Sequence, residues 1–235
     1  MALSLDRQNG YRERYRRARP DWRPATEVYE SLIRERVRSS VRVLDLGCGR
    51  GGVLEQLGAA IDQPIGIDPD ARSLVEHRLR DLPRAAATAD AIPLQAASVD
   101  CIVCSWVLEH VADPQRVFFE VARCLRPGGA FIFLTPNAHS LISLINRALR
   151  PVQHTLVPRL YGRTEADTFP VLYRANSKAR LDQLAERAGL MPDRFYQIPD
   201  PSYLAFTPAL YTLSVLLSRR TPPVHLTGVY RRRST

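Results

Sequence analysis

Lysine is almost absent from this sequence of 235 residues, where Lys178 is the only one, so arginine carries nearly all of the positive charge. Long apolar runs are absent too. The most apolar stretch, residues 203–218, contains Pro208 and is shorter than the roughly 18 to 20 residues that a membrane-spanning helix needs. Residues 1–20 are rich in arginine and lack the apolar core of a signal peptide. We therefore expect a cytoplasmic protein without a membrane-spanning helix.

Cysteine is scarce as well, and the sequence contains only Cys48, Cys101, Cys104 and Cys124. Without a secretory signal we expect reduced thiols. Cys101 and Cys104 have the spacing of a metal-binding or redox pair, but they lie in an apolar, strand-like segment. Residues three apart in a strand point to opposite faces. We therefore predict no metal site and no redox pair here.

The net charge of +9 is unevenly distributed along the chain. Arginines crowd residues 7–23 and again residues 219–233. Such blocks suit an anionic partner, such as lipid head groups, a phosphorylated substrate or nucleic acid. A solvated basic surface without a partner is the alternative, and the charge alone does not separate the two.

Apolar segments alternate with helical patterns in the first part of the chain. We predict helices over residues 26–39, 53–60, 70–82 and 113–125, and strands over residues 41–46, 64–68, 85–88, 99–105 and 130–135. The strands are continuous apolar runs, which is typical of a parallel sheet covered on both faces. Ligands of such sheets bind at the carboxyl ends of the strands.

This alternation ends after residue 137. Residues 138–176 form a long segment with one short helix, residues 141–149, and long insertions of this kind are often lids or substrate-binding loops. The remaining chain predicts two helices and two final strands, over residues 177–188, 203–218, 195–198 and 224–230. We see no internal repeat and no second domain.

A glycine-rich turn, residues 45–52, follows the first predicted strand with the sequence Asp-Leu-Gly-Cys-Gly-Arg-Gly-Gly. Glycines allow a tight turn and the close approach of a ligand to the main chain. The turn also satisfies GxGxxG, the dinucleotide fingerprint. Asp68 ends the second strand about 20 residues later, where a carboxylate can accept hydrogen bonds from a ribose diol. These features predict an adenosine-containing ligand but do not separate NAD from S-adenosylmethionine.

Three further motifs follow in order. Residues 90–91 (Asp-Ala) follow the third strand, residues 105–111 follow the fourth and contain Leu-Glu-His, and residues 125–129 (Leu-Arg-Pro-Gly-Gly) precede the fifth. With them, residues 40–137 resemble the class I S-adenosylmethionine-dependent methyltransferases. The similarity is closest to the type 11 group, which includes quinone-biosynthesis and related small-molecule enzymes.

The resemblance implies a Rossmann-like, doubly wound α/β fold with seven strands and helices on both faces. The sheet is expected to be mostly parallel, with the last strand antiparallel. We predict one methyltransferase domain over residues 1–235. Its expected parts are an N-terminal helical cap, the cofactor-binding core, the lid and the C-terminal part of the sheet, over residues 1–39, 40–137, 138–176 and 177–235.

The resemblance also implies residues for the methionine end of the cofactor. The backbone of Gly47, Cys48 and Gly49 would meet the amino-acid part of S-adenosylmethionine. Asp45 would help to hold its ammonium group, through water or the loop. Ser105 would line the same end of the site. A turn-capping role is the alternative for Asp45.

For the adenosine end, the resemblance places Asp68 on the ribose hydroxyls and Pro69 against the adenine. Asp90 would accept a hydrogen bond from the adenine amino group, with the Ala91 amide nearby. Pro69 departs from the larger apolar residue that is usual in the family, which puts the adenine packing in doubt. Asp90 can also be read as a cap of a turn or helix.

The catalytic residue is not determined by these motifs. His110 is a candidate general base, although a packed structural histidine is the alternative. His139, His154 and Tyr173 are further candidates near strand ends or in the lid. We expect Trp106 to form a wall of the site. A base is needed if the acceptor is a hydroxyl, because its proton must leave around the transfer.

The acceptor is expected to be chosen by residues 137–218. A small molecule, a sugar or a lipid-linked compound methylated at oxygen is our first hypothesis. The Asn-Pro-Pro-Tyr type motif of amino-methylating nucleic-acid enzymes is missing after the fourth strand, which makes nucleic acid an unfavoured substrate. The alternatives are an NAD(P)-dependent oxidoreductase and a non-catalytic S-adenosylmethionine-binding or nucleic-acid-binding protein.

The apolar helix predicted over residues 203–218 is followed at once by Arg219 and Arg220. One hypothesis is that it lies on an anionic membrane, at the inner face, or receives a lipid-linked acceptor. The alternative is a helix packed on the sheet or at a homodimer interface. The oligomeric state stays open.

Overall fold

A single seven-stranded sheet forms the centre of the protein in a computed structural model that describes residues 3–37, 40–57, 63–149 and 170–234. The strand order is β3-β2-β1-β4-β5-β7-β6. The strands are β1 Arg42–Leu46, β2 Gln63–Asp68, β3 Arg84–Ala86, β4 Val99–Ser105, β5 Leu125–Pro136, β6 Leu190–Ile198 and β7 His225–Arg232. Only β7 is antiparallel to its two neighbours, so the last strand of the chain runs against the rest, as predicted.

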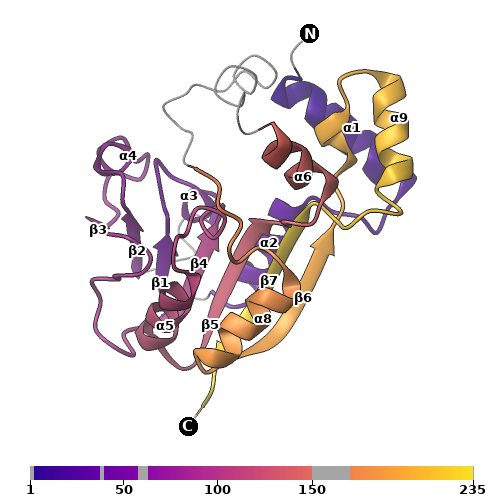
Figure 1. Cartoon of the computed structure of the whole chain (residues 1–235). Helices are drawn as coiled ribbons and strands as arrows, with labels where there is room; N and C mark the ends of the chain where they lie inside the picture. The colour runs from indigo at the N-terminus through magenta and orange to yellow at the C-terminus, as the bar shows by residue number, and fades with distance from the viewer. Residues whose placement is uncertain (1–2, 38–39, 58–62, 150–169, 235) are drawn as a thin grey trace.

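Helices cover both faces of this sheet (Figure 1). The helices of one face are α1 Leu5–Ala18, α2 Ala25–Arg34 and α3 Val53–Leu57, and those of the other are α5 Pro114–Cys124 and α8 Lys178–Arg187. Strand residues alternate between two apolar cores. Val43 and Val103 belong to the core with α2, whereas Leu44 and Ile102 belong to the core with α5. The predicted doubly wound α/β fold is therefore confirmed.

The four cysteines are free and buried, and all but Cys48 belong to these cores. Cys101 lies in the core with α2, and Cys104 lies in the core with α5. The two thiols of the CxxC spacing therefore point to opposite faces of β4, as strand alternation predicts.

Several element boundaries differ from the prediction. A helical cap was predicted over residues 1–39, but the bounds of the arginine-rich helix α1 were not, and the helix expected over residues 70–82 is only α4, Ala71–Val75. The strand expected over residues 130–135 already begins at Leu125, and β6 begins five residues before the predicted 195. Part of the helix expected over residues 26–39 and the end of that over 53–60 lie outside the described residues.

The single helix predicted over residues 203–218 is wrong, because the structure has two elements there. A 3-10 helix, η4 Pro201–Leu204, precedes α9, Pro208–Leu217. Pro208 occupies the first turn of α9, where its missing N–H costs nothing, and the Thr207 hydroxyl accepts from the Leu210 amide at 3.2 Å. These residues start a new helix instead of continuing an old one.

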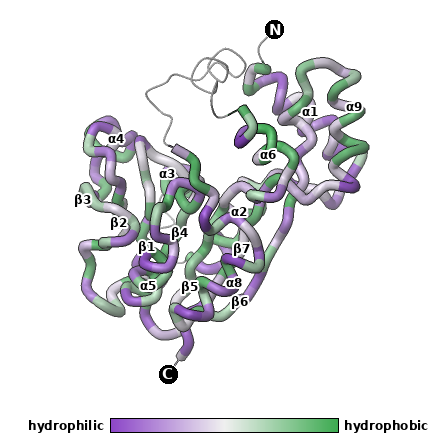
Figure 2. The backbone as a smooth tube through the Cα atoms, viewed as in Figure 1, coloured by the Kyte–Doolittle hydropathy of each residue, from purple (hydrophilic) through white to green (hydrophobic). Residues whose placement is uncertain are grey.

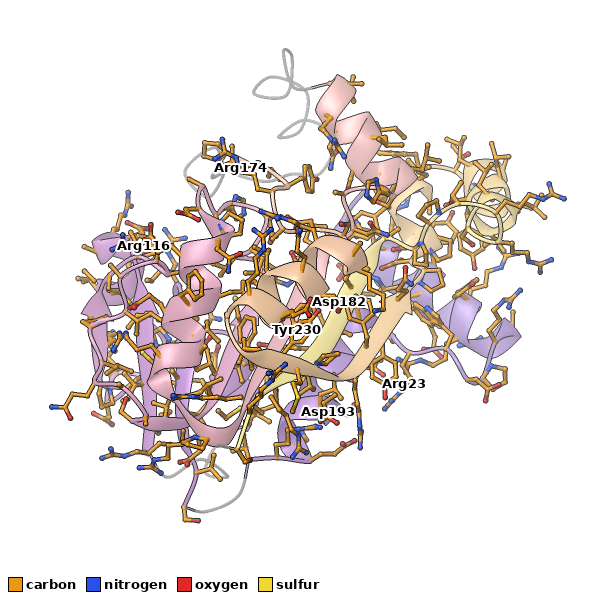
Figure 3. All side chains as sticks on the ribbon, turned by 60° about the horizontal axis from the view of Figure 1, so that its bottom comes forward. Arg23, Arg116, Arg174, Asp182, Asp193 and Tyr230 are labelled. Carbon is orange, nitrogen blue, oxygen red and sulfur yellow. The ribbon has the colours of Figure 1, made fainter. Side chains whose placement is uncertain are left out.

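The outer elements gather beyond the carboxyl ends of the parallel strands (Figure 1). Helix α6, Leu141–Ala148, follows β5, and η4 follows β6 and packs against α1. On the opposite side, Tyr230 of β7 donates to Asp182 of α8 at 2.8 Å (Figure 3), which fixes α8 to the sheet. Among the residues that the structure describes, no helix is both long enough and apolar enough to cross a membrane.

Candidate active site

A cavity of about 530 Å³ lies at the carboxyl ends of β1, β2 and β4. Its wall contains most of the residues predicted to bind the cofactor, namely Asp45, Gly47, Cys48, Gly49, Asp68, Pro69 and Ser105. His110, the predicted catalytic candidate, and Trp106 also line it. Residues from strand ends far apart in the sequence thus meet at one cavity, where ligands of such sheets bind.

The glycine turn forms the floor of this cavity between β1 and α3. Gly47 and Gly49 have φ angles of 81° and 50°, a conformation that side chains other than glycine rarely adopt. A Cβ atom on Gly47 would lie 2.2 Å from a methyl group of Val107, so no larger residue fits there. A Cβ on Gly49 would meet no atom within 4 Å, so the backbone at this residue is open to a ligand.

Asp68 connects the end of β2 with the glycine turn. One carboxylate oxygen accepts from the Gly49 amide at 2.9 Å, and the other accepts from the Asp70 amide at 2.9 Å. The side chain is thereby fixed at the cavity wall with 9% of the residue exposed. Each carboxylate oxygen can accept a second hydrogen bond, so Asp68 retains capacity for two ribose hydroxyls.

Asp45 lies beside Asp68 and is more deeply buried, with 3% exposed. Burial, and then the negative charge of Asp68, raise the pKa of Asp45 to about 7. Two carboxyl groups that share one cavity repel each other when both are ionised. A positively charged ligand group would relieve this repulsion, so the pair favours a cationic ligand.

Helix α2 supplies a wall of the cavity that the sequence did not indicate. Thr26, Tyr29 and Glu30 line it. The Tyr29 hydroxyl is buried and makes no hydrogen bond with any described residue. Burial, and then the charge of Asp45, raise the pKa of Tyr29 well above its usual value, so the phenol stays protonated and can donate. No sequence signal distinguished Tyr29 from the other residues of this amphipathic helix.

Trp106 directly follows β4 and has a left-handed backbone with a φ of 60°. Its amide donates to the Leu134 carbonyl at 2.9 Å, and its ring packs edge-on against His225 with 5.3 Å between centroids. Strained backbones of bulky residues cluster at functional sites. Trp106 is thus held as a wall of the cavity, in the place where a wall residue was expected.

His110 is held one turn further along the loop after β4. Its Nδ1 lies 3.0 Å from the Pro170 carbonyl oxygen. Because a carbonyl oxygen can only accept, Nδ1 carries the proton and Nε2 holds the lone pair of the neutral ring. Burial lowers the pKa of His110 below its ordinary value, which favours this neutral form at pH 7.

A buried polar chain lies behind His110. The Thr135 hydroxyl donates to a Glu109 carboxylate oxygen at 3.1 Å, and the Asn176 amide donates to that hydroxyl at 2.5 Å. The Leu172 amide donates to the main-chain carbonyl of Glu109 at 2.7 Å. Burial raises the pKa of Glu109 to about 7. These bonds connect the loop after β4, the end of β5 and the segment before α8.

Asp90 and Ala91 do not belong to the cavity wall. The Asp90 main-chain carbonyl accepts from Arg116 of α5 at 2.9 Å, and the Ala91 amide donates to Thr88 at 3.1 Å. Figure 3 labels Arg116 on α5. The adenine contacts assigned to Asp90 and Ala91 therefore stay predictions that rest on the resemblance alone.

The other candidate bases lie away from the cavity or outside the described residues. His139 is exposed after β5, and Tyr173, with a φ of 54°, packs against Arg147 at 5.3 Å from its ring centre. Neither lines the cavity. His154 falls outside the described part of the chain, as do residues 150–169 of the lid predicted over residues 138–176.

Comparison with known proteins agrees with this geometry. Residues 44–133 match the family model described as a methyltransferase domain. The chain is 37% identical over 161 residues to the ubiquinone biosynthesis O-methyltransferase of Bordetella pertussis, covering 66% of this chain and 64% of that protein. It is 36% identical over 103 residues to the enzyme of the same name from Aromatoleum aromaticum, covering 41% and 44%. Across the curated relatives compared, the matched segments span 37% to 64% of the relative's length.

The fold is also similar to that of a solved methyltransferase. The structure superposes on geranyl diphosphate C-methyltransferase from Streptomyces coelicolor with a TM-score of 0.63, at 14% identity, covering 88% of this chain and 80% of that one. That protein was solved with S-adenosyl-L-homocysteine. Residues 44–133 carry a methyltransferase domain, and in sequence and in fold the chain is similar to the class I S-adenosylmethionine-dependent methyltransferases.

Proposed function

We propose that the protein transfers a methyl group from S-adenosylmethionine to an oxygen atom of a small-molecule, sugar or lipid-linked acceptor. The observation that carries the proposal is the meeting of the glycine turn, Asp68 and His110 at one cavity. S-adenosylmethionine supplies a methyl group made electrophilic by its sulfonium charge. The protein's own contribution is to hold the cofactor, orient the acceptor and take up a proton.

The residues of the cavity fit this cofactor. The open backbone at Gly49 accommodates the amino-acid end, and Asp68 has free accepting capacity for the ribose hydroxyls. Asp45 and Asp68 together favour a cationic ligand. The unpartnered Tyr29 hydroxyl gives one buried donor or acceptor that a bound ligand can satisfy, which removes the cost of leaving it without a hydrogen bond.

His110 supports oxygen as the acceptor atom. A hydroxyl acceptor must lose its proton as its oxygen becomes methylated, and a neutral imidazole is suited to take it. The Pro170 carbonyl fixes Nδ1 as the protonated nitrogen, and Nε2, which lies 4.0 Å from a Glu109 carboxylate oxygen, holds the lone pair that can take up the proton. The names of the ubiquinone biosynthesis relatives point to the same atom. We propose His110 as the general base of the reaction.

The experiment is a labelled-methyl transfer screen over sugar, lipid, quinone and phenol acceptors, with His110→Gln and His139→Gln compared on any acceptor found. His139 is exposed and outside the cavity wall, so its variant is the matched control. We expect His110→Gln to lower kcat by about a hundredfold or more, with unchanged cofactor affinity, and His139→Gln to have little effect. Transfer only to nitrogen, sulfur or carbon, or full activity of His110→Gln, would overturn the proposal.

A further inference from the structure

Helix α9 has its apolar residues on the outside. Leu210, Leu213 and Leu216 are 41%, 49% and 52% exposed, although these residues lie three apart along one side of the helix. The residues of α9 that are buried are Tyr211 and Ser214. A surface helix of a globular protein normally shows the reverse arrangement, with its apolar side toward the core. Figure 2 shows the apolar colour along α9 at the outer end of the molecule.

The polar side of α9 is held by α1. The rings of Tyr11 and Tyr211 stack with 4.6 Å between centroids, and the Arg14 guanidinium lies 5.2 Å from the centre of the Tyr211 ring. At the start of α9, the Arg7 guanidinium donates to the Phe206 carbonyl at 3.0 Å. These contacts fix the rotation of α9 about its axis. The leucines therefore face outward because α1 binds the opposite side.

Positive charge borders the exposed leucines. Arg219 and Arg220 follow Ser218, the C-cap of α9, and are exposed, and neither forms an ion pair with any described residue. Arg14 and Arg17 are exposed on α1, the helix that supports α9, and Arg17 forms an ion pair with Glu13 at 3.6 Å. No acidic residue follows Asp200 in the sequence. The leucines of α9 with Arg219 and Arg220, here called the α9 surface, thus combine exposed apolar side chains with unbalanced positive charge.

We propose that the α9 surface docks on an anionic lipid bilayer. Anionic head groups complement the arginines, and leucines at this spacing can enter the boundary between head groups and acyl chains. A helix of ten residues is about 15 Å long, so it can lie in the interface but cannot cross the membrane. A symmetric dimer through the same surface is less suited, because it would bring like-charged arginine pairs together.

The α9 surface is linked to the cavity. The chain before α9 carries Tyr203, whose hydroxyl lies 3.1 Å from Nε2 of His225. His225 in turn packs against Trp106, a wall of the cavity. A bilayer bound by α9 would therefore lie at the same end of the molecule as the cavity (Figure 1). If the proposed methyl transfer holds, this position favours an acceptor that is delivered from the membrane.

Co-sedimentation with vesicles tests the docking, using phosphatidylcholine with and without phosphatidylglycerol. We expect the full chain to sediment only with the anionic vesicles and to dissociate as salt is raised. The double variant Leu213→Ser, Leu216→Ser should lower binding by roughly tenfold or more, because it removes the apolar contact. The double variant Arg219→Gln, Arg220→Gln should lower it by roughly fivefold for each charge.

Phe119→Ser is the matched control, because Phe119 is 50% exposed on α5, far in the fold from α9. It should leave vesicle binding unchanged. No sedimentation of the wild-type chain with anionic vesicles would overturn the proposal, as would equal binding by the leucine variant. Sedimentation velocity tests the alternative that a second copy of the chain binds the α9 surface. If the wild-type chain is a dimer that does not bind vesicles, and the leucine variant is a monomer, then α9 forms a dimer interface and the proposal is overturned. None of these readouts depends on methyl transfer.

Discussion

Two regions of the molecule differ in which residues they bury and in the sign of their charge. One is the sheet core around the cavity, and the other is the end formed by α1, η4 and α9. In the core, Val117, Phe118 and Val121 of α5 are fully buried against the sheet. In α9, the leucines are half exposed and the buried residues are a tyrosine and a serine. The cavity is acidic through Asp45 and Asp68, whereas the end with α9 is basic.

This difference shows that apolar content alone does not decide which side of a helix is buried. Both α5 and α9 begin with proline in the first turn and a side-chain cap, Asp113 or Thr207. What separates them is the neighbour that each helix meets. A sheet face is a large apolar surface, so α5 buries its apolar side, whereas α1 offers Tyr11 and Arg14 to α9.

The largest effect expected from the comparison is in the core. Phe118→Ala should lower the free energy of unfolding by about 3 to 5 kcal/mol, because Phe118 is fully buried among Phe131 and Tyr230 and its removal leaves a cavity. Equilibrium denaturation with urea measures this value. Substitution of an exposed residue typically costs less than about 1 kcal/mol. A loss this small for Phe118→Ala would mean that α5 is not packed as described.

The next effect concerns the acidic cavity. Asp68→Ala should weaken the binding of S-adenosylhomocysteine by more than about tenfold, because one hydrogen-bonded hydroxyl pair contributes at least this much to affinity. The fold should stay intact by circular dichroism. Asp81→Ala is the control, since Asp81 is exposed and outside this cavity. Unchanged affinity in Asp68→Ala would show that the ribose assignment is wrong.

Asp45 should make the stability of the fold depend on pH, which distinguishes the acidic cavity from the rest of the molecule. Its pKa is about 7 in the folded protein against an ordinary value of 3.8, so the unfolded chain releases the proton first as pH rises. Between these two pKa values the fold therefore loses stability with increasing pH, by at most about 1.4 kcal/mol per unit. Asp45→Asn should remove this slope and raise the melting temperature at pH 8.

If Asp45 holds the cofactor's ammonium, the affinity of the wild-type chain for the cofactor should rise from pH 6 to pH 8, and the affinity of the Asp45→Asn variant should not. Titration calorimetry at both pH values would refute the assignment if the two proteins behaved alike.

The smallest effect belongs to α9. Leu213→Ala should change the free energy of unfolding by less than about 0.5 kcal/mol, because the side chain is already half exposed. The same urea denaturation as for Phe118→Ala measures it. The difference between the two variants compares a buried side chain of α5 with a half-exposed side chain of α9. A loss above 2 kcal/mol, roughly the cost of deleting a buried leucine, would show that Leu213 is buried in solution.

Much of the fold and half of the cavity could be predicted because they depend on local patterns. Continuous apolar strands predict a parallel sheet, and a glycine turn after such a strand must lie at the edge where ligands bind. Asp68 and Ser105 end their strands and Asp45 is the next-to-last residue of β1, so their place in the cavity follows from the sheet. Their contacts with the cofactor stay predictions.

The rest depends on how distant elements dock. Tyr29 reaches the cavity only because α2 packs over the end of β1, and no residue spacing in that helix reports it. Helix α1 lies inside the predicted helical cap, but its bounds were not predicted, because its buried residues, Gln8 and Tyr15, give no apolar period. The outward leucines of α9 likewise follow from the contact with α1. The sequence predicts an apolar helix there, but not which side is covered.

The central claim is that this cavity binds S-adenosylmethionine, and calorimetric titration of the purified full chain tests it most directly. S-adenosylhomocysteine and NADH are titrated in parallel. We expect saturable binding of S-adenosylhomocysteine with one site per chain, and no heat of binding for NADH. Saturable binding of NADH, or a folded chain that binds neither compound, would contradict it.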